Sequence, residues 1–211
     1  MINLIICDDH RIVREGLIQL LGLYSDFHII DSVATGEALI KVLKTTQPDV
    51  LILDISLPGR SGLEALKFLK KSYPEVPTLI LSMFSEEQYG LRALKAGAAG
   101  YLKKVSAPTE LVSAIRKIVG GGKYINQSLA EKLADEYDSD RKERMHEKLS
   151  NREYQIMCFI ASGKSAEKIA TELSISINTV YSYRNRILEK MHLKSNVELT
   201  QYALQNKLIE I

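Results

Sequence analysis

Five short apolar runs alternate with five amphipathic segments over residues 1–120, and this alternation constrains the fold more than any other feature of the chain. The strand-like runs are residues 3–7, 28–34, 50–53, 78–81 and 99–102. The helical periods are residues 11–23, 37–46, 62–72, 86–96 and 108–119. Such alternation predicts an α/β domain, a doubly wound five-stranded parallel sheet with helices on both faces.

The composition is that of a protein with a sizeable core. Of 211 residues, 45% are hydrophobic and 26% are charged, as in globular proteins. The longest apolar runs are too short to span a bilayer and the first residues lack a basic signal segment, so we expect a cytoplasmic protein without a membrane partner. Cys7 and Cys158 lie in apolar segments and are expected to be reduced core residues.

Polar side chains follow the strand-like runs at the points where these runs end. Doubly wound sheets form their sites outside the carboxyl ends of the strands. If the strand order is 2-1-3-4-5, the side chains that meet there are those of Asp8, Asp9, Asp54, Ser82 and Lys104. Each alone is explained by a helix cap, a turn hydroxyl or a surface charge, but their arrival at one edge favours a chemical role.

Three crowded carboxylates repel one another, so this group of residues requires a cation. Oxygen ligands suit a hard ion such as Mg²⁺, with Mn²⁺ as the alternative. A carboxylate between a metal and a lysine has the groups needed for phosphoryl transfer. Asp54 would be the nucleophile, Lys104 would stabilise charge on the phosphoryl oxygens, and Ser82 would hydrogen-bond to one of them.

These motifs carry a family resemblance. Residues 1 to about 120 resemble the receiver domain of bacterial two-component response regulators, through CDD at 7–9, DISLPGRSG at 54–62, LSMF at 81–84 and GYLKK at 100–104. The resemblance implies a flavodoxin-like fold and phosphorylation of Asp54 by a sensor histidine kinase.

The resemblance also implies roles for the residues around Asp54. Asp9, Asp54 and the backbone carbonyl of Ser56 would bind Mg²⁺, and Asp8 would support the metal through water. The family's spacing after the glycine of GYLKK selects Lys104 over its neighbour Lys103. The family's aromatic switch position is occupied by Tyr101, whose alternative interpretation is a core aromatic with a solvated hydroxyl.

The chain changes character after residue 122. A short amphipathic helix is predicted at 128–137, and residues 138–148 are almost entirely charged with acids and bases in balance, which predicts a solvated linker. We therefore place a first domain at 1–122, the linker at 123–148 and a second domain at 149–211. In the second, Ser150 and Glu153 form a capping box, and four short helices are predicted at 151–161, 166–173, 177–191 and 196–206.

The helices at 166–173 and 177–191, joined by a turn, predict a helix-turn-helix whose second helix enters a DNA major groove. Its residues Val180, Ile187, Leu188 and Met191 recur at helical spacing and should face the core. The opposite face is polar. Basic side chains that could neutralise phosphates are Arg184, Arg186, Lys164 and Lys168. The alternative is that polar residues on a helix face are simply solvated.

Residues 149–199 are similar over their full length to the LuxR-type helix-turn-helix, and with the receiver they are identified as a member of the NarL/FixJ family. In that family the residues that match Tyr181, Ser182 and Asn185 reach bases, while those that match Thr179 and the arginines contact the DNA backbone. The resemblance implies a transcription factor, not an enzyme, that binds double-stranded promoter DNA as a phosphorylated homodimer. RNA polymerase would be a further partner.

Two interpretations from other classes compete with this one. A Mg²⁺-dependent phosphatase or phosphotransferase could use the same acidic residues, but it leaves residues 149–211 without a role. A DNA-binding protein with a degenerate, unphosphorylated receiver is the second, and the complete set of site residues argues against it.

Overall fold

The computed structural model describes residues 1–58, 61–106, 108–137 and 144–209. The chain divides into two compact units, Met1–Lys132 and Leu133–Ile211. The division falls inside the segment expected as a linker, 123–148. Gly59 and Arg60 of the DISLPGRSG motif, and the charged linker residues 138–143, lie outside the described residues.

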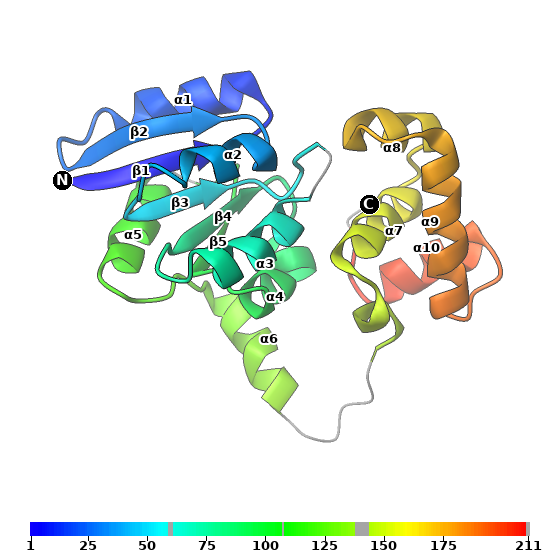
Figure 1. Ribbon diagram of the computed structural model, residues 1–211. Helices are drawn as coiled ribbons and strands as arrows, with labels where there is room; N and C mark the ends of the chain where they lie inside the picture. The colour runs from blue at the N-terminus through cyan, green and yellow to red at the C-terminus, as the bar shows by residue number, and fades with distance from the viewer. Residues whose placement is uncertain (59–60, 107, 138–143, 210–211) are drawn as a thin grey trace. The chain divides into compact units, whose positions relative to one another are not determined.

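The first unit contains a five-stranded sheet whose pairings are all parallel, in the order β2-β1-β3-β4-β5. Its strands are β1 (Ile2–Cys7), β2 (Phe27–Val33), β3 (Val50–Leu53), β4 (Thr78–Ser82) and β5 (Gly100–Lys103). The helices are α1 (Arg11–Leu21), α2 (Gly36–Val42), α3 (Gly62–Ser72), α4 (Glu86–Lys95) and α5 (Pro108–Val119). They lie on both faces of the sheet (Figure 1). The predicted fold class and strand order are confirmed.

Alternate side chains of the central strands point to opposite faces of the sheet, as the pleat requires. On one face, alternate strand residues pack with residues of α1 and α5 in a single cluster, which includes Leu4, Ile6, Val50, Ile52, Leu79, Leu81, Leu21, Leu111 and Ile115. Every residue of β3 and β4 is buried, because both faces of these central strands are covered.

Two helices end two or more residues earlier than the sequence pattern predicts. α1 ends at Leu21, because the Gly22 N–H already closes the helix on the Ile18 carbonyl. α2 ends at Val42 although the apolar pattern runs to residue 46. The pattern continues past the helix because Leu43 is still buried in the turn that follows.

The segment after α5 remains in the first unit and hydrogen-bonds to the edge of its sheet. The Tyr124 N–H donates to the Ala99 carbonyl at 2.9 Å, beside β5. Helix α6 (Gln127–Tyr137) then contacts α4: Ser128 Oγ donates to Glu87 Oε1 at 2.9 Å, and Lys132 Nζ donates to the Glu87 carbonyl at 2.5 Å. The first half of α6 is therefore fastened to α4.

After the end of α6, the second unit contains a short 3-10 turn, η1 (Met145–Lys148), and the helices α7 (Asn151–Ala161), α8 (Ala166–Leu173), α9 (Ile177–Lys190) and α10 (Asn196–Gln205). Serine side chains cap all four helices. Ser174, with φ of 51°, forms the turn between α8 and α9. The predicted inner face of α9 is confirmed, since Val180, Ile187, Leu188 and Met191 are buried. Within the described residues, no helix has the length and apolar character to cross a membrane.

The loop after β3 is pressed against the main chain of Asp54. Gly62, the first residue of α3, donates its N–H to the Ile55 carbonyl at 2.9 Å. A Cβ added at Gly62 would lie 1.9 Å from the Asp54 carbonyl oxygen. A glycine is therefore required here, and it fixes how the chain leaves Asp54.

Replacing Gly62 with alanine should destabilise the protein by about 1–3 kcal/mol, because the new Cβ overlaps main-chain atoms that no rotamer change can move. Gly16→Ala is the control: it lies within α1, nothing is within 4 Å of its added Cβ, and it should stabilise the protein by about 0.5–1 kcal/mol. Urea unfolding followed by circular dichroism measures both. Equal effects of the two substitutions would contradict the close approach at Gly62.

Candidate functional site

The sheet delivers two aspartates to one place. β1 and β3 are adjacent, and Cys7 at the end of β1 pairs with Leu53 at the end of β3. Asp8 and Asp54 therefore emerge side by side, and the Asp54 N–H donates to the Cys7 carbonyl at 2.9 Å. Each aspartate is only 2% exposed. Two carboxylates buried together are unfavourable unless a cation accompanies them.

Lys104 supplies a cation. Its Nζ lies 2.6 Å from Asp8 Oδ2 and 3.0 Å from Asp54 Oδ2. Its own N–H donates to the Ser82 carbonyl at 2.7 Å, which holds the lysine main chain at the end of β4. Burial disfavours the ammonium, but the carboxylates of Asp54 and Asp8 outweigh burial and raise the pKa of Lys104. Lys104 is therefore charged at neutral pH.

The two carboxylate oxygens of Asp54 have different surroundings. Oδ2 accepts a hydrogen bond from Lys104, whereas Oδ1 is buried and has no hydrogen-bond partner. Burial raises the pKa of Asp54, the Lys104 ammonium lowers it, and the Asp8 carboxylate raises it again, with a net rise. A buried carboxylate oxygen without a partner is costly, so Oδ1 is suited to an incoming cation or phosphoryl group.

Four residues at this edge could hold a metal ion. Asp8, Asp9, His10 and Asp54 each offer one ligand atom, and these atoms lie within 4.8 Å of one another. Three carboxylates carry more charge than one lysine ammonium balances, and their oxygens suit a hard divalent ion. The acidic site together with the unpartnered Asp54 Oδ1 therefore fits a divalent metal. Sequence reasoning missed His10, whose position directly after the acidic pair was the available signal.

Ser82 and Tyr101 are linked through one main-chain residue. Ser82 is fully buried, and its Oγ accepts the Phe84 N–H at 3.3 Å. The Tyr101 ring is also fully buried, and its hydroxyl donates to the Phe84 carbonyl at 3.0 Å. A displacement of Ser82 would therefore act on Tyr101 through Phe84. Ser56 is half-buried, and its N–H lowers the pKa of Asp54; its carbonyl stays a predicted ligand.

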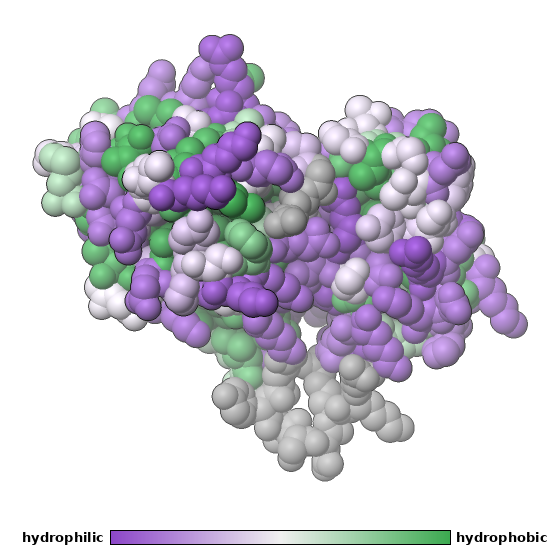
Figure 2. Space-filling view, in the orientation of Figure 1, coloured by the Kyte–Doolittle hydropathy of each residue, from purple (hydrophilic) through white to green (hydrophobic). Residues whose placement is uncertain are grey.

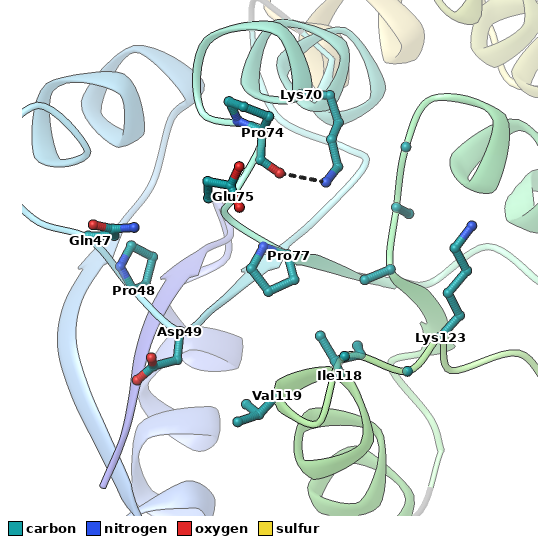
Figure 3. Close-up of a pocket in the computed structure, with 15 residues that line it drawn as sticks. Gln47, Pro48, Asp49, Lys70, Pro74, Glu75, Pro77, Ile118, Val119 and Lys123 are labelled. Atoms are coloured by element: carbon teal, nitrogen blue, oxygen red, sulfur yellow. Dashed lines mark hydrogen bonds between the residues drawn. The ribbon is translucent and has the colours of Figure 1, made fainter.

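A cavity of about 820 Å³ lies at the other end of the sheet (Figure 3). Its walls include Asp49, Pro77 and Ala99, which precede β3, β4 and β5, and Lys70, whose Nζ donates to the Pro74 carbonyl at 3.2 Å. Sites of doubly wound folds form at the opposite, carboxyl ends of the strands. The acidic residues lie at the edge of the sheet that carries Asp54, so this cavity is separate from the site that the sequence predicts.

The predicted DNA-binding residues lie on α9, on α8 (Lys168) and just before α8 (Lys164). Those with exposed side chains are Lys168, Tyr181, Ser182, Asn185 and Arg186. Other predicted contacts are engaged within the protein. Arg184 Nε donates to Asn196 Oδ1 on α10 at 2.7 Å, Lys164 Nζ lies 2.6 Å from Glu172 Oε2, and Thr179 Oγ1 lies 2.7 Å from the Oγ of the capping residue Ser176.

Known proteins share both parts of this architecture. Residues 4–116 match the response regulator receiver domain, and residues 147–203 match the bacterial regulatory proteins of the luxR family. Response regulator UvrY of Escherichia coli K12 is 36% identical over 209 residues, which cover 99% of this chain and 96% of UvrY. Oxygen regulatory protein NreC of Staphylococcus carnosus TM300 is 37% identical over 216 residues, which cover 99% of each chain.

A solved structure is similar to this chain over nearly its full length. RcsB from Salmonella enterica serovar Typhimurium, bound to promoter rprA in the presence of phosphomimetic BeF3-, matches with a TM-score of 0.65 and 26% identity over 96% of this chain and 98% of RcsB.

An acidic site at the carboxyl end of a parallel sheet, joined to a helix-turn-helix, defines a phosphorylation-controlled transcription regulator. The chain belongs to the two-component response regulators of the NarL/FixJ family, which combine a receiver domain with a LuxR-type helix-turn-helix. The family consists of regulators, so the interpretation as a phosphatase or phosphotransferase enzyme is excluded.

Asp54→Asn should raise the free energy of unfolding near pH 7 by about 1 kcal/mol in EDTA, because it removes a buried charge. Since the pKa of Asp54 is raised in the folded state, the native protein binds this proton more tightly than the unfolded chain. The stability of the native protein therefore falls as pH rises through that pKa, and the gain from Asp54→Asn should disappear below the ordinary aspartate pKa of about 3.9.

Urea unfolding of both proteins across this pH range measures the difference. Asp49→Asn is the control, because Asp49 precedes β3 at the opposite end of the same strand. A gain from Asp54→Asn that stays constant as pH falls would contradict the assignment to a buried charge.

Proposed function

We propose that Asp54 is the phosphoacceptor and that a sensor histidine kinase phosphorylates it, which controls dimerisation and promoter binding. The observation that carries the proposal is the Lys104 ammonium, which lies 2.6 and 3.0 Å from the two buried carboxylates of Asp8 and Asp54. Such an ammonium stabilises the charge that builds up on phosphoryl oxygens during transfer. The buried Oδ1 of Asp54, which has no hydrogen-bond partner, is consistent with this role.

In the transfer, an oxygen of Asp54 forms a bond to phosphorus while the bond from phosphorus to the kinase's histidine nitrogen breaks. The electron pair of the broken bond stays on that nitrogen, and the ring takes up one proton from the solvent and leaves as neutral imidazole. Lys104 then pairs with a phosphoryl oxygen, and the Ser82 hydroxyl donates a hydrogen bond to another.

Asp8, Asp9, Asp54 and the Ser56 carbonyl would hold Mg²⁺, with Mn²⁺ as the alternative ion. The residues supply mainly carboxylate oxygens, which these ions prefer. When bound, the ion would neutralise charge on the carboxylates and on the phosphoryl oxygens. His10 lies beside this group and offers a nitrogen, which suits Mn²⁺ better than Mg²⁺.

Phosphorylation adds charge beside Ser82 and would move it toward the phosphoryl group. Because Ser82 and Tyr101 both hydrogen-bond to the main chain of Phe84, that movement would shift Phe84 and the start of α4. We assign this switching to a receiver at 1–122 and the output to a DNA-binding domain at 149–211, with 123–148 between them. The changed receiver surface would favour a homodimer.

In the second domain, we assign base contacts to Tyr181, Ser182 and Asn185. Phosphate contacts are assigned to Thr179, Arg184, Arg186, Lys164 and Lys168. Basic residues exceed acidic ones only slightly in this domain, so firm binding requires two recognition helices on two half-sites. RNA polymerase is the further partner, since a regulator bound at a promoter acts on transcription there.

Phosphorylation of the protein should tighten its binding to DNA selected from a random pool by about 5-fold to 150-fold, a typical coupling between two sites. Asp54→Asn should abolish labelling by acetyl phosphate and this tightening, because it removes the attacking oxygen. Asp49→Asn, on the same strand but at its other end, should retain both. Gel shifts with and without acetyl phosphate measure the effect.

Stimulation that survives in Asp54→Asn would contradict the assignment. If the unchanged protein binds DNA equally tightly with and without acetyl phosphate, the result would instead support a degenerate receiver.

Mg²⁺ at one hundred times its dissociation constant should stabilise the protein by about 2.7 kcal/mol, as for any ligand that binds only the native state. Asp9→Asn should lose most of this gain, because one ligand of the proposed set loses its charge. Asp49→Asn should keep it. Thermal unfolding in EDTA and in a MgCl₂ series gives the comparison, and an undiminished gain in Asp9→Asn would remove Asp9 from the metal site.

A further inference from the structure

The outer face of α9 carries an apolar pair, Ile177 and Tyr181. They are 40% and 49% exposed. Positions four residues apart share one face of a helix, so the two side chains are neighbours. Among the large hydrophobic side chains described in the second unit, only Val197 is comparably exposed. The base contacts proposed above make no use of Ile177.

Polar groups near this pair already have partners within the helix. Ser182 Oγ donates to the Asn178 carbonyl at 2.9 Å, and Thr179 Oγ1 lies 2.7 Å from Ser176 Oγ. The hydroxyls of the first two turns are thus occupied in part by local hydrogen bonds. Ile177 is the first residue of α9, and the N-terminal residues of a recognition helix are the ones that contact base edges.

An isoleucine offers no hydrogen bond, so it can recognise only an apolar group. The major groove presents one such group on the four natural bases, the 5-methyl of thymine. We propose that Ile177, with Tyr181 beside it, contacts the 5-methyl group of a thymine in each half-site and so sets part of the DNA sequence preference. This inference rests on the proposed function, because it requires α9 to enter the major groove.

The surroundings of the pair favour DNA over a protein partner. Asn185 and Arg186 are exposed on the following turn, and Lys168 is exposed on α8. The visible face of the second unit is mostly hydrophilic, with hydrophobic colour in small areas only (Figure 2). Protein-docking surfaces are larger continuous apolar patches, whereas two apolar side chains among amides and basic groups match the mixed edge of a base-pair step.

The test replaces single thymines of a selected DNA site by deoxyuridine, which removes the methyl group and keeps every hydrogen-bonding atom. The site is first selected from a random pool with the phosphorylated full-length protein. A replacement in one half-site should weaken binding by about fourfold, the usual effect of losing one buried methyl contact, and replacements in both half-sites by about 16-fold. Ile177→Ala should weaken binding to the thymine site by a similar factor and should bind the thymine and deoxyuridine sites equally.

Val197→Ala is the control, because it shortens another exposed apolar side chain and should keep the full preference for thymine. Unchanged circular dichroism and unfolding temperature establish that each variant is folded. A preference for thymine that persists in Ile177→Ala, or the absence of any deoxyuridine effect in the unchanged protein, overturns the inference while leaving DNA binding intact. Failure of the phosphorylated protein to select any DNA overturns the proposed function as well.

Discussion

The ammonium of Lys104 between two buried carboxylates is the interaction on which the receiver site depends. β3 and β5 are not neighbours, because β4 lies between them. Neighbouring strands are about 4.8 Å apart, so a side chain from the end of β5 must cross about 10 Å to reach the end of β3. The lysine and aspartate side chains cover this distance together, so Lys104 meets Asp54 across the end of β4, where Ser82 lies.

The same arrangement leaves the site short of positive charge. Asp8, Asp9 and Asp54 bring three carboxylates to one ammonium, and Asp54 Oδ1 is left unpartnered. The excess charge acts on the neighbouring core, since burial first, and then Asp8 and Asp54, raise the pKa of the Cys7 thiol and keep it neutral. The sheet and the tight turn at Gly62 hold these carboxylates together despite their repulsion. Proteins tolerate such a loss of stability mainly at functional sites.

The sequence alone predicts the features that depend on periodicity and strand order. A parallel sheet brings strand ends together, so the meeting of Asp8, Asp54 and Lys104 could be inferred without coordinates. The position of His10 directly after the acidic pair made it a candidate, but the distance of its ring from the carboxylates depends on how α1 starts. The bond from Arg184 to Asn196 could not be inferred, since it joins two helices through side-chain geometry that no spacing rule encodes.

A series of contacts leads from the site toward the linker. The Tyr101 ring is already buried in this structure, and its hydroxyl donates to the main-chain carbonyl of Phe84. The Phe84 ring stacks on Tyr89 of α4, with centroids 4.6 Å apart. α4 in turn holds α6 through Glu87, which binds Ser128 and Lys132. A shift of α4 would therefore act on the first half of α6, up to residue 132, where the first unit ends.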